Sequence, residues 1–473
     1  MTDLNGKDVD VLLNASRCGD NKTVDILIAR GISVKAVNDN GINALMFASS
    51  RGNDTTVDLL IIRGSDIKAV DKNGKNALMY ASESGNDKTV DLLIKRGSDV
   101  KAVDKYGKNA LMYALGRGQD KTVDLLINGG SDVKAVDTFG KNALMYASES
   151  ANDRIVDLLI NRGSDVKAVD KYGMNALMYA SQNGNIKIVD LLIKKGSDVE
   201  AVDKIGNNAL IWAIKWGNDK TIDLLINRGS DVNAVDENGI NALMYASERG
   251  NYKTVDLLIN RGSDVKAVDK YGKNALMYAS ENGNDKTVDL LINRGSDVKA
   301  VDKYGKNALM YASVNGNDKT VELLIKKGSD VKAVDAFGKN ALMYALEECQ
   351  DKTIHFLMKS RFDISSQAKL IIHQDKVSKL LIKSGADVNI IDENGWSALM
   401  YAAKSGAQQT VKLLVESDCN VLAVNKDGNN ALAIASKYGY KDIVEFLSSL
   451  LNTNVIVETK QYAGRVKSLV SRL

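Results

Sequence analysis

Residues 302–334, DKYGKNALMYASVNGNDKTVELLIKKGSDVKAV, are one copy of a unit that recurs every 33 residues through most of the chain. A fixed period of this length is typical of a repeat array. The preceding copy differs only where Glu281, Asp289, Asn293 and Arg294 correspond to Val314, Glu322, Lys326 and Lys327.

The unit predicts a turn followed by two short helices. Asp302 and Gly305 give a turn signal, since glycine accepts a positive φ and aspartate bonds its own backbone. Asn307 is expected to cap a first helix that begins at Ala308. Gly316 is expected to stop this helix and Gly328 the second one.

The second helix carries Val321, Leu323, Leu324 and Ile325 on one face, and the segment SDVKAVD after it alternates apolar and polar residues, which suits a short extended finger. Helices of this length are not stable alone. We therefore expect the units to stack, with Leu309, Leu323, Leu324 and their counterparts forming one continuous core.

These residues resemble the ankyrin repeat: an Asp-x-x-Gly turn, a first helix, a Gly, a Val-x-x-Leu-Leu helix and a closing Gly. The family's Thr-Pro-Leu-His box is replaced by Asn-Ala-Leu-Met, for example at 76–79, 109–112 and 142–145, and the chain has no proline. We expect Asn to cap the helix and Met to pack, because Met cannot replace the hydrogen bonds of His. The resemblance implies an all-α repeat solenoid, a curved and elongated array of stacked helix-turn-helix units with short β-hairpin fingers.

The chain of 473 residues is predicted to divide into a capping repeat, a regular array and an irregular end. The predicted segments are an N-terminal capping repeat at 1–37, ten full ankyrin repeats at 38–367, a shortened degenerate repeat at 368–391, two C-terminal repeats at 392–451, and a tail at 452–473. The shortened repeat is a candidate hinge. The tail is either a helix that caps the last repeat or a segment for partner binding, membrane-surface binding or export.

The composition favours a protein of the reducing interior of a cell. Cys18, Cys349 and Cys419 are far apart in sequence, and no segment has the roughly 18 uninterrupted apolar residues of a membrane span. The first 16 residues do not combine a basic stretch with an apolar run, the pattern expected of a signal peptide. We expect a soluble cytoplasmic monomer; delivery into another cell stays open. The net charge of +3 provides no global field to attract nucleic acid or membrane, so nucleic acid is an unfavoured partner.

Enzymatic and metal chemistry find no support in the residue pattern. The only histidines, His355 and His373, are not at metal-ligand spacing from cysteines or carboxylates. Every recurring Gly and Asp has a structural position in the repeat, so no phosphate loop or acid–base pair stands out. We expect no enzymatic activity, no cofactor and no metal.

The resemblance implies that partners bind the concave side, which consists of the finger tips and the exposed end of the first helix. The tips combine aromatic residues and lysines, and Trp216 is a bulky residue near the end of a first helix. The candidate partner-binding residues are Lys105, Tyr106, Lys108, Phe139, Lys171, Tyr172, Trp216, Lys270, Tyr271, Lys273, Lys303, Tyr304, Lys306 and Phe337. Alternatively, each tip Tyr only packs on its neighbouring finger.

Three functions follow from these residues and from the resemblance. The first is a non-enzymatic scaffold that binds partner proteins of unknown identity along the groove. The second, suggested by the family, is a microbial effector that acts on host proteins. The third is an anion binder, for nucleic acid or an acidic membrane, that uses the finger-tip lysines.

Overall fold

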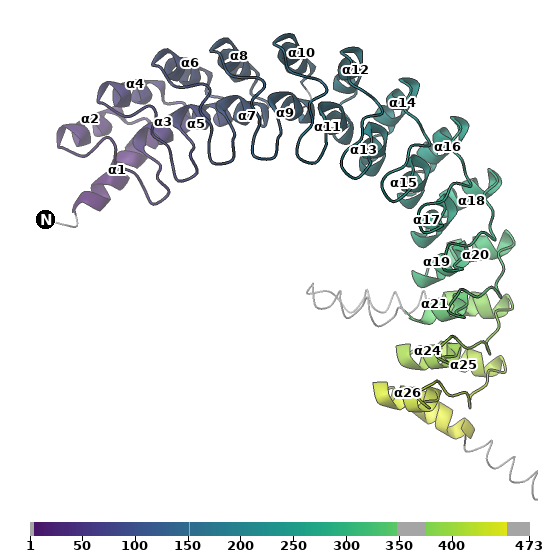
Figure 1. Cartoon of the computed structure of the whole chain (residues 1–473). Coiled ribbons are helices and arrows are strands. Elements are labelled where there is room, and N and C mark those ends of the chain that lie inside the picture. Colours follow the sequence, from purple (N-terminus) through teal and green to yellow (C-terminus); the bar gives the residue numbers. More distant parts are fainter. Residues whose placement is uncertain (1–3, 151, 348–374, 452–473) are drawn as a thin grey trace, which may run out of the picture. The chain divides into compact units, whose positions relative to one another are not determined.

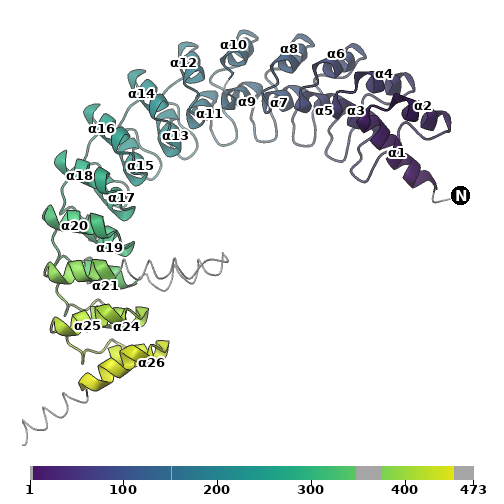
Figure 2. The same cartoon turned by 180° about the vertical axis from the view of Figure 1, so that it is seen from behind.

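The computed structural model describes residues 4–150, 152–347 and 375–451. By its contacts the chain divides into two compact units, residues 1–234 (unit 1) and 235–473 (unit 2), which are described separately. Each unit is an all-α solenoid of helix pairs, as predicted. In each, the first helices form one row and the second helices a parallel row (Figures 1 and 2).

Unit 1 contains seven helix pairs. Its first helices are α1 (Leu4–Cys18), α3 (Ala44–Arg51), α5 (Ala77–Ser84), α7 (Ala110–Leu115), α9 (Ala143–Glu149), α11 (Ala176–Gln182) and α13 (Ala209–Trp216). Its second helices are α2 (Asn21–Ala29), α4 (Asp54–Ile62), α6 (Asp87–Lys95), α8 (Asp120–Asn128), α10 (Asp153–Asn161), α12 (Ile186–Lys194) and α14 (Asp219–Asn227). The finger loops of unit 1 extend beyond its row of first helices (Figure 1).

Unit 2 continues the same alternation. Its first helices are α15 (Ala242–Glu248), α17 (Ala275–Glu281), α19 (Ala308–Val314), α21 (Ala341–Glu347), α24 (Ala398–Ser405) and α26 (Ala431–Tyr438). Its second helices are α16 (Tyr252–Asn260), α18 (Asp285–Asn293), α20 (Asp318–Lys326) and α25 (Gln408–Glu416). Residues 375–383 and 441–451 are helical as well.

The helix cap and most of the core positions in the repeat 302–334 are those that the sequence predicts. The side chain of Asn307 accepts a hydrogen bond from the backbone N–H of Met310 at 3.0 Å and so caps α19, while Met310 is buried. Leu309, Val321 and Leu324 are fully buried. Leu323, which we expected in the core, is only half-buried, as is Ile325 on the same helix. In α20 the buried positions are Thr320, Val321 and Leu324, so the core of this repeat uses Thr320 in place of the predicted Leu323.

The fingers are less extended than expected. Eight of the described fingers pair their two sides through a single antiparallel bridge, such as Val301 with Asn307. After α20, the Asp330 carboxylate accepts a hydrogen bond from the Lys332 backbone N–H at 2.9 Å and folds this segment into a turn.

Side-chain hydrogen bonds connect one repeat to the next. The Asn317 side chain donates to the backbone carbonyls of Ser280 and Glu281 in the preceding repeat, at 3.2 and 2.9 Å. Gly283 permits this approach, because a Cβ there would lie 2.7 Å from the Asn317 side-chain oxygen and its φ is +68°. These bonds hold successive first helices in register.

The repeat that opens at Asp335 is arranged differently from the full repeat predicted at 335–367. The helix at 375–383 takes the place of its second helix, since Lys376 pairs with Asp318 at the start of α20. Thr410 donates to Asp375 at 2.6 Å, the contact that Thr122 makes with Asp87 in unit 1. The predicted hinge at 368–391 therefore contains a regular second helix, and 348–374 lie outside the described residues.

The other predicted boundaries stay predictions, and the tail at 452–473 lies outside the described residues. In the predicted N-terminal cap, Asp10, Asn14 and Arg17 are exposed on α1. Asp8 is only half-exposed.

Changing Asn307 to Ala is expected to destabilise α19 by about 1 kcal/mol, because the first turn loses its cap. Amide exchange measured by mass spectrometry across 308–314 should accelerate about fivefold. Asn307→Ser is the matched control, since Ser397 caps α24 with a bond to the Met400 backbone N–H. Equal exchange in the Ala and Ser variants would contradict the capping role.

Candidate functional site

The finger turn is built around a buried aspartate. Both Tyr304 and Lys306 donate their backbone N–H groups to one carboxylate oxygen of Asp302, at 2.8 and 2.9 Å. Gly305 donates to the Asp302 backbone carbonyl at 3.0 Å and has a φ of +78°. The turn therefore fixes the two tip residues, 303 and 304, at the end of the finger.

Neighbouring fingers are joined through the backbone of their tips. In unit 1 the carbonyl of Tyr106 accepts from the N–H of Thr138 at 2.8 Å, and that of Phe139 accepts from Lys171 at 2.8 Å. In unit 2 the carbonyl of Tyr271 accepts from Lys303 at 2.9 Å. The tips are thus ordered before any partner binds, and their side chains form a row.

The second tip residue of four consecutive fingers in unit 1 is apolar and exposed. Tyr106, Phe139, Tyr172 and Ile205 are each about half exposed (46–57%), and we call this row strip 1. The rings of Phe139 and Tyr172 stack with centroids 6.5 Å apart and an interplanar angle of 17°. In unit 2, Tyr271, Tyr304 and Phe337 form the equivalent strip 2.

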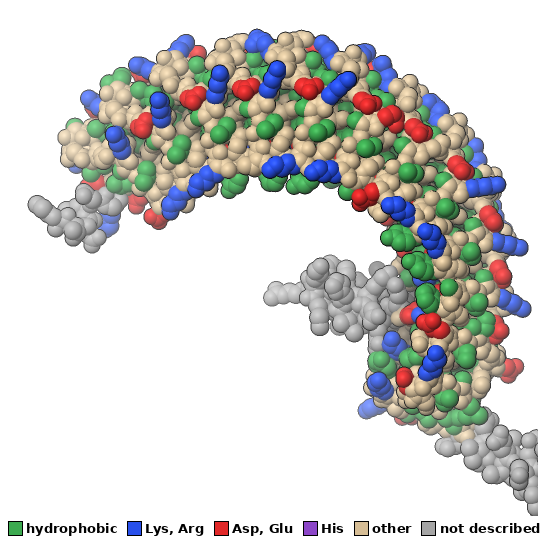
Figure 3. Space-filling model, in the orientation of Figure 1, with side chains coloured by type: hydrophobic (Ala, Val, Ile, Leu, Met, Phe, Trp, Pro, Cys, Tyr) green, Lys and Arg blue, Asp and Glu red, His purple; other side chains and the backbone are tan. Residues whose placement is uncertain are grey.

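Positive charge accompanies both strips. The first tip residue is an exposed lysine at Lys105, Lys171 and Lys204 in strip 1, and at Lys270 and Lys303 in strip 2. Lysine or arginine and hydrophobic side chains lie together along the finger edge of unit 1 (Figure 3). Exposed acidic tip residues are found at fingers without an aromatic tip, at Asp39, Glu237, Glu393 and Asp427.

A ladder of lysine and tyrosine lies behind the tips. In unit 1, the Lys75 ammonium lies 4.4 Å from the ring centroid of Tyr80 in its own repeat and 4.2 Å from that of Tyr113 in the next. In unit 2, Lys273 lies between Tyr278 and Tyr311 at 4.1 and 4.4 Å. These cation–π contacts connect one repeat to the next.

The ladder tyrosines also bind the turn aspartates. The Tyr311 hydroxyl donates to the second carboxylate oxygen of Asp302 at 2.7 Å. In the repeat of α13, the indole N–H of Trp212 makes the same contact with Asp203 at 3.0 Å. Burial, and then the hydrogen bond to Asp302, raise the pKa of Tyr311 well above its usual value.

Most ladder lysines are paired with a glutamate eight residues later, at the end of the first helix. Lys75, Lys141, Lys273 and Lys339 pair with Glu83, Glu149, Glu281 and Glu347. Burial alone would raise the pKa of Glu83, but the ion pairs with Lys75 and Arg117 lower it. Lys108 and Lys306 have no such glutamate, because Gly116 and Val314 occupy the position.

The predicted partner-binding residues therefore fall into three groups. The tip residues Lys105, Tyr106, Phe139, Lys171, Tyr172, Lys270, Tyr271, Lys303, Tyr304 and Phe337 are exposed. Lys108, Lys273 and Lys306 belong to the ladder, and Lys273 is largely buried in an ion pair. Trp216 is 57% exposed but lies at the far end of α13, a helix length from the tip of its repeat. Their role in binding stays a prediction.

The ladder is the feature that sequence reasoning missed. A signal was present: Asp, Lys and Tyr recur at spacings of four and five residues, as in Asp302, Lys306 and Tyr311. The glutamate recurs with the lysine in four repeats and is replaced in two. This recurrence of the four residue types at fixed spacing predicts contact among the four positions.

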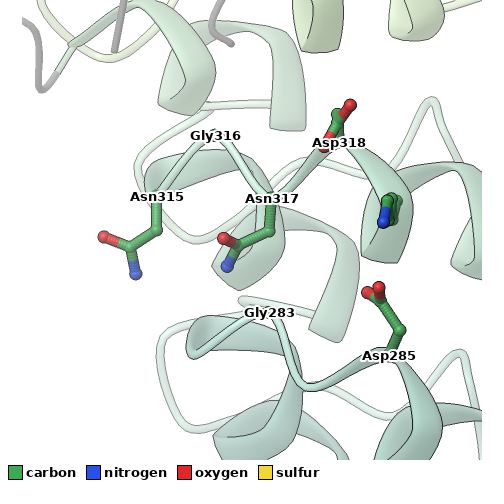
Figure 4. Close-up of a pocket in the computed structure, with 7 residues that line it drawn as sticks. Gly283, Asp285, Asn315, Gly316, Asn317 and Asp318 are labelled. Atoms are coloured by element: carbon green, nitrogen blue, oxygen red, sulfur yellow. The ribbon is translucent and has the colours of Figure 1, made fainter. Parts of the chain in front are cut away.

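A hollow between two repeats of unit 2 contains Asp285, Asn315, Asn317 and Asp318 (Figure 4). Its carboxylates are engaged, since Asp285 accepts from the Thr320 hydroxyl and Asp318 pairs with Lys376. Within the described ranges, no cluster of His, Cys, Asp and Glu could hold a metal ion. Across the same residues, no helix has the length and apolarity needed to cross a membrane. His355, His373 and Cys349 lie outside these ranges.

High pH is expected to unfold the array through the ladder. The pKa of Tyr311 and of its counterparts is raised in the folded state. The neutral tyrosines therefore stabilise the fold fully below their usual pKa of about 10, and this contribution to stability is lost as the pH rises above that value. Phenolate absorbance of these tyrosines should therefore rise together with the loss of helical circular dichroism. Complete phenolate formation with the helices intact would contradict this prediction.

Comparison with known proteins agrees with this geometry. A family model described as ankyrin repeats matches residues 12–104, 96–170, 144–236, 210–302, 286–368 and 371–458. No curated protein was found to match the chain. With paired helices, Asp–Gly fingers and a family match over most of its length, the chain belongs to the ankyrin-repeat family.

Proposed function

We propose that this protein is a non-enzymatic scaffold that binds partner proteins along strips 1 and 2. Ankyrin repeats commonly mediate protein–protein interaction and are typically without catalytic activity. The observation that carries the proposal is the row of half-exposed apolar side chains on consecutive fingers, Tyr106, Phe139, Tyr172 and Ile205.

Such a row suits a binding surface for two reasons. Tyrosine and phenylalanine provide a large contact area at a low cost in side-chain entropy, and tyrosine is enriched at binding hot spots. The tips are also held by backbone hydrogen bonds to one another, so little ordering is needed on binding. A stable interface of about 1,200–2,000 Å² could be assembled from several consecutive fingers.

A purely structural role explains the tip aromatics less well. The tyrosine that joins neighbouring repeats is the half-buried one on the first helix, such as Tyr311, whose ring contacts Lys273 of the preceding repeat. The tip residue contributes its backbone to the finger row, and this contribution does not need an aromatic side chain. Asn40, Asn73 and Asn238 occupy the same tip position in other fingers.

Anion binding is the second candidate, because exposed lysines accompany the strips. Lys72, Lys105, Lys171 and Lys204 face solvent in unit 1, and among the described residues none of them is in an ion pair. An acidic tip, Asp39 in unit 1 and Glu237 in unit 2, would repel a polyanion that follows all the fingers of either unit. A binder of nucleic acid would lose affinity steeply with salt, by roughly one unit of log–log slope for each phosphate contact.

The test is affinity capture from a cell lysate with the full chain and a variant that carries Tyr106→Ala, Tyr172→Ala, Tyr271→Ala and Tyr304→Ala. A protein retained by the wild type should be lost by this variant, because the variant removes four contact residues. The matched control is Tyr252→Ala with Tyr438→Ala, two exposed tyrosines outside the finger tips, and it should retain the protein.

Two results would contradict the proposal. One is capture of the same proteins by the tip variant and the wild type. The other is capture of nucleic acid alone.

A further inference from the structure

Two ladder lysines lack the counter-ion that the others have. At 273 and 339 in unit 2, the lysine pairs with a glutamate eight residues later. Lys306, between them in the array, has Val314 at that position. In unit 1, Lys108 lies between the paired Lys75 and Lys141 and has Gly116 there.

Lys306 contacts aromatic rings through its ammonium group. Its ammonium lies 4.4 Å from the ring centroid of Tyr344 and 6.0 Å from that of Tyr311. The nearest glutamates along the ladder, Glu281 and Glu347, are bound to the neighbouring lysines. Among the described residues, no carboxylate forms an ion pair with Lys306 or with Lys108.

Each unpaired lysine lies on a finger that belongs to a strip. Lys306 is on the finger of Tyr304, the middle finger of strip 2, and Lys108 is on the finger of Tyr106 in strip 1. Exposed lysines precede both tyrosines, whereas acidic tips occur only outside the strips. Charge complementarity therefore favours a negatively charged partner with apolar side chains.

We propose that the partner of each strip is an extended acidic polypeptide segment that places one carboxylate on Lys306 in unit 2 or on Lys108 in unit 1. The carboxylate takes the place of the missing glutamate, while apolar side chains of the segment contact the tip aromatics. This inference rests on the proposed function, since it names the partner class of the same strips.

The repeat spacing favours an extended segment. Helices pack about 8–10 Å apart, which sets the distance between successive fingers. A polyproline II chain advances about 3.1 Å per residue, so every third residue would meet the next finger. A partner segment in which an acidic residue and an apolar residue each recur every third position therefore matches the spacing of the fingers in a strip.

The test uses a fluorescent peptide of about five tandem Glu-Leu-Pro copies, a polyproline II sequence with this period. Its binding to the full chain is measured by anisotropy and compared with that of the Gln-Leu-Pro analogue. The key variant combines Val314→Glu with Gly116→Glu, which supplies the missing counter-ion from within the repeat. Val314→Gln with Gly116→Gln is the neutral control of equal size.

The acidic peptide should bind the wild type and the Gln variant, and the Glu variant should bind it about tenfold more weakly or worse, because a charge-assisted bond is lost. The neutral peptide should bind weakly to all three proteins. Glu281 and Glu347 occupy the substituted position in neighbouring repeats, so the Glu variant is expected to fold, and circular dichroism checks this.

Equal affinity of the Glu and Gln variants for the peptide would overturn the inference. So would a lack of peptide binding, or binding only to phosphatidylserine vesicles or to a second copy of the chain. If lysate capture still depends on the tip tyrosines in these cases, the proposed function survives and only the partner class is wrong. If lysate capture does not depend on the tip tyrosines either, both the proposed function and the partner class are wrong.

Discussion

The contact between neighbouring repeats is the constraint on which this structure depends. Helices of six to nine residues, such as α7 and α20, are too short to be stable alone. Leu309 and Leu324 become fully buried only because another pair of helices covers them. Three kinds of polar contact cross the same boundary: the lysine–tyrosine ladder, the Asn317 bonds and the hydrogen bonds between finger backbones. Apolar packing and these polar contacts therefore align neighbouring repeats in the same register.

This constraint decides where the repeats are free to differ. The buried positions and the turn aspartate are nearly identical from copy to copy, because each must fit two neighbours. The tip residues and the end of the first helix face solvent, and here aromatic, lysine, asparagine and acidic residues alternate between fingers. Differences such as Val314 against Glu281 therefore change surface chemistry without disturbing the stack, and the proposed binding specificity resides in them.

Much of the fold could be predicted from the sequence, because its signals are local and repeated. The period, the Asn307 cap and the Gly305 turn each depend on a few adjacent residues. The ladder was missed because Lys306 was considered a finger residue, whereas its ammonium reaches the Tyr344 ring of the next repeat. The neighbours of the helix at 375–383 could not be predicted, because Asp318 and Thr410, which contact it, belong to other repeats.

The central claim, that the finger tips form the binding surface, can be tested most directly by site-specific photo-crosslinking. A photoreactive phenylalanine analogue would replace Tyr304, or Tyr252 on α16 as the reference position, in the full chain. After irradiation in cell lysate, the account predicts that position 304 links to a partner protein and position 252 does not. Equal linkage at both positions, or linkage at 252 alone, would contradict it.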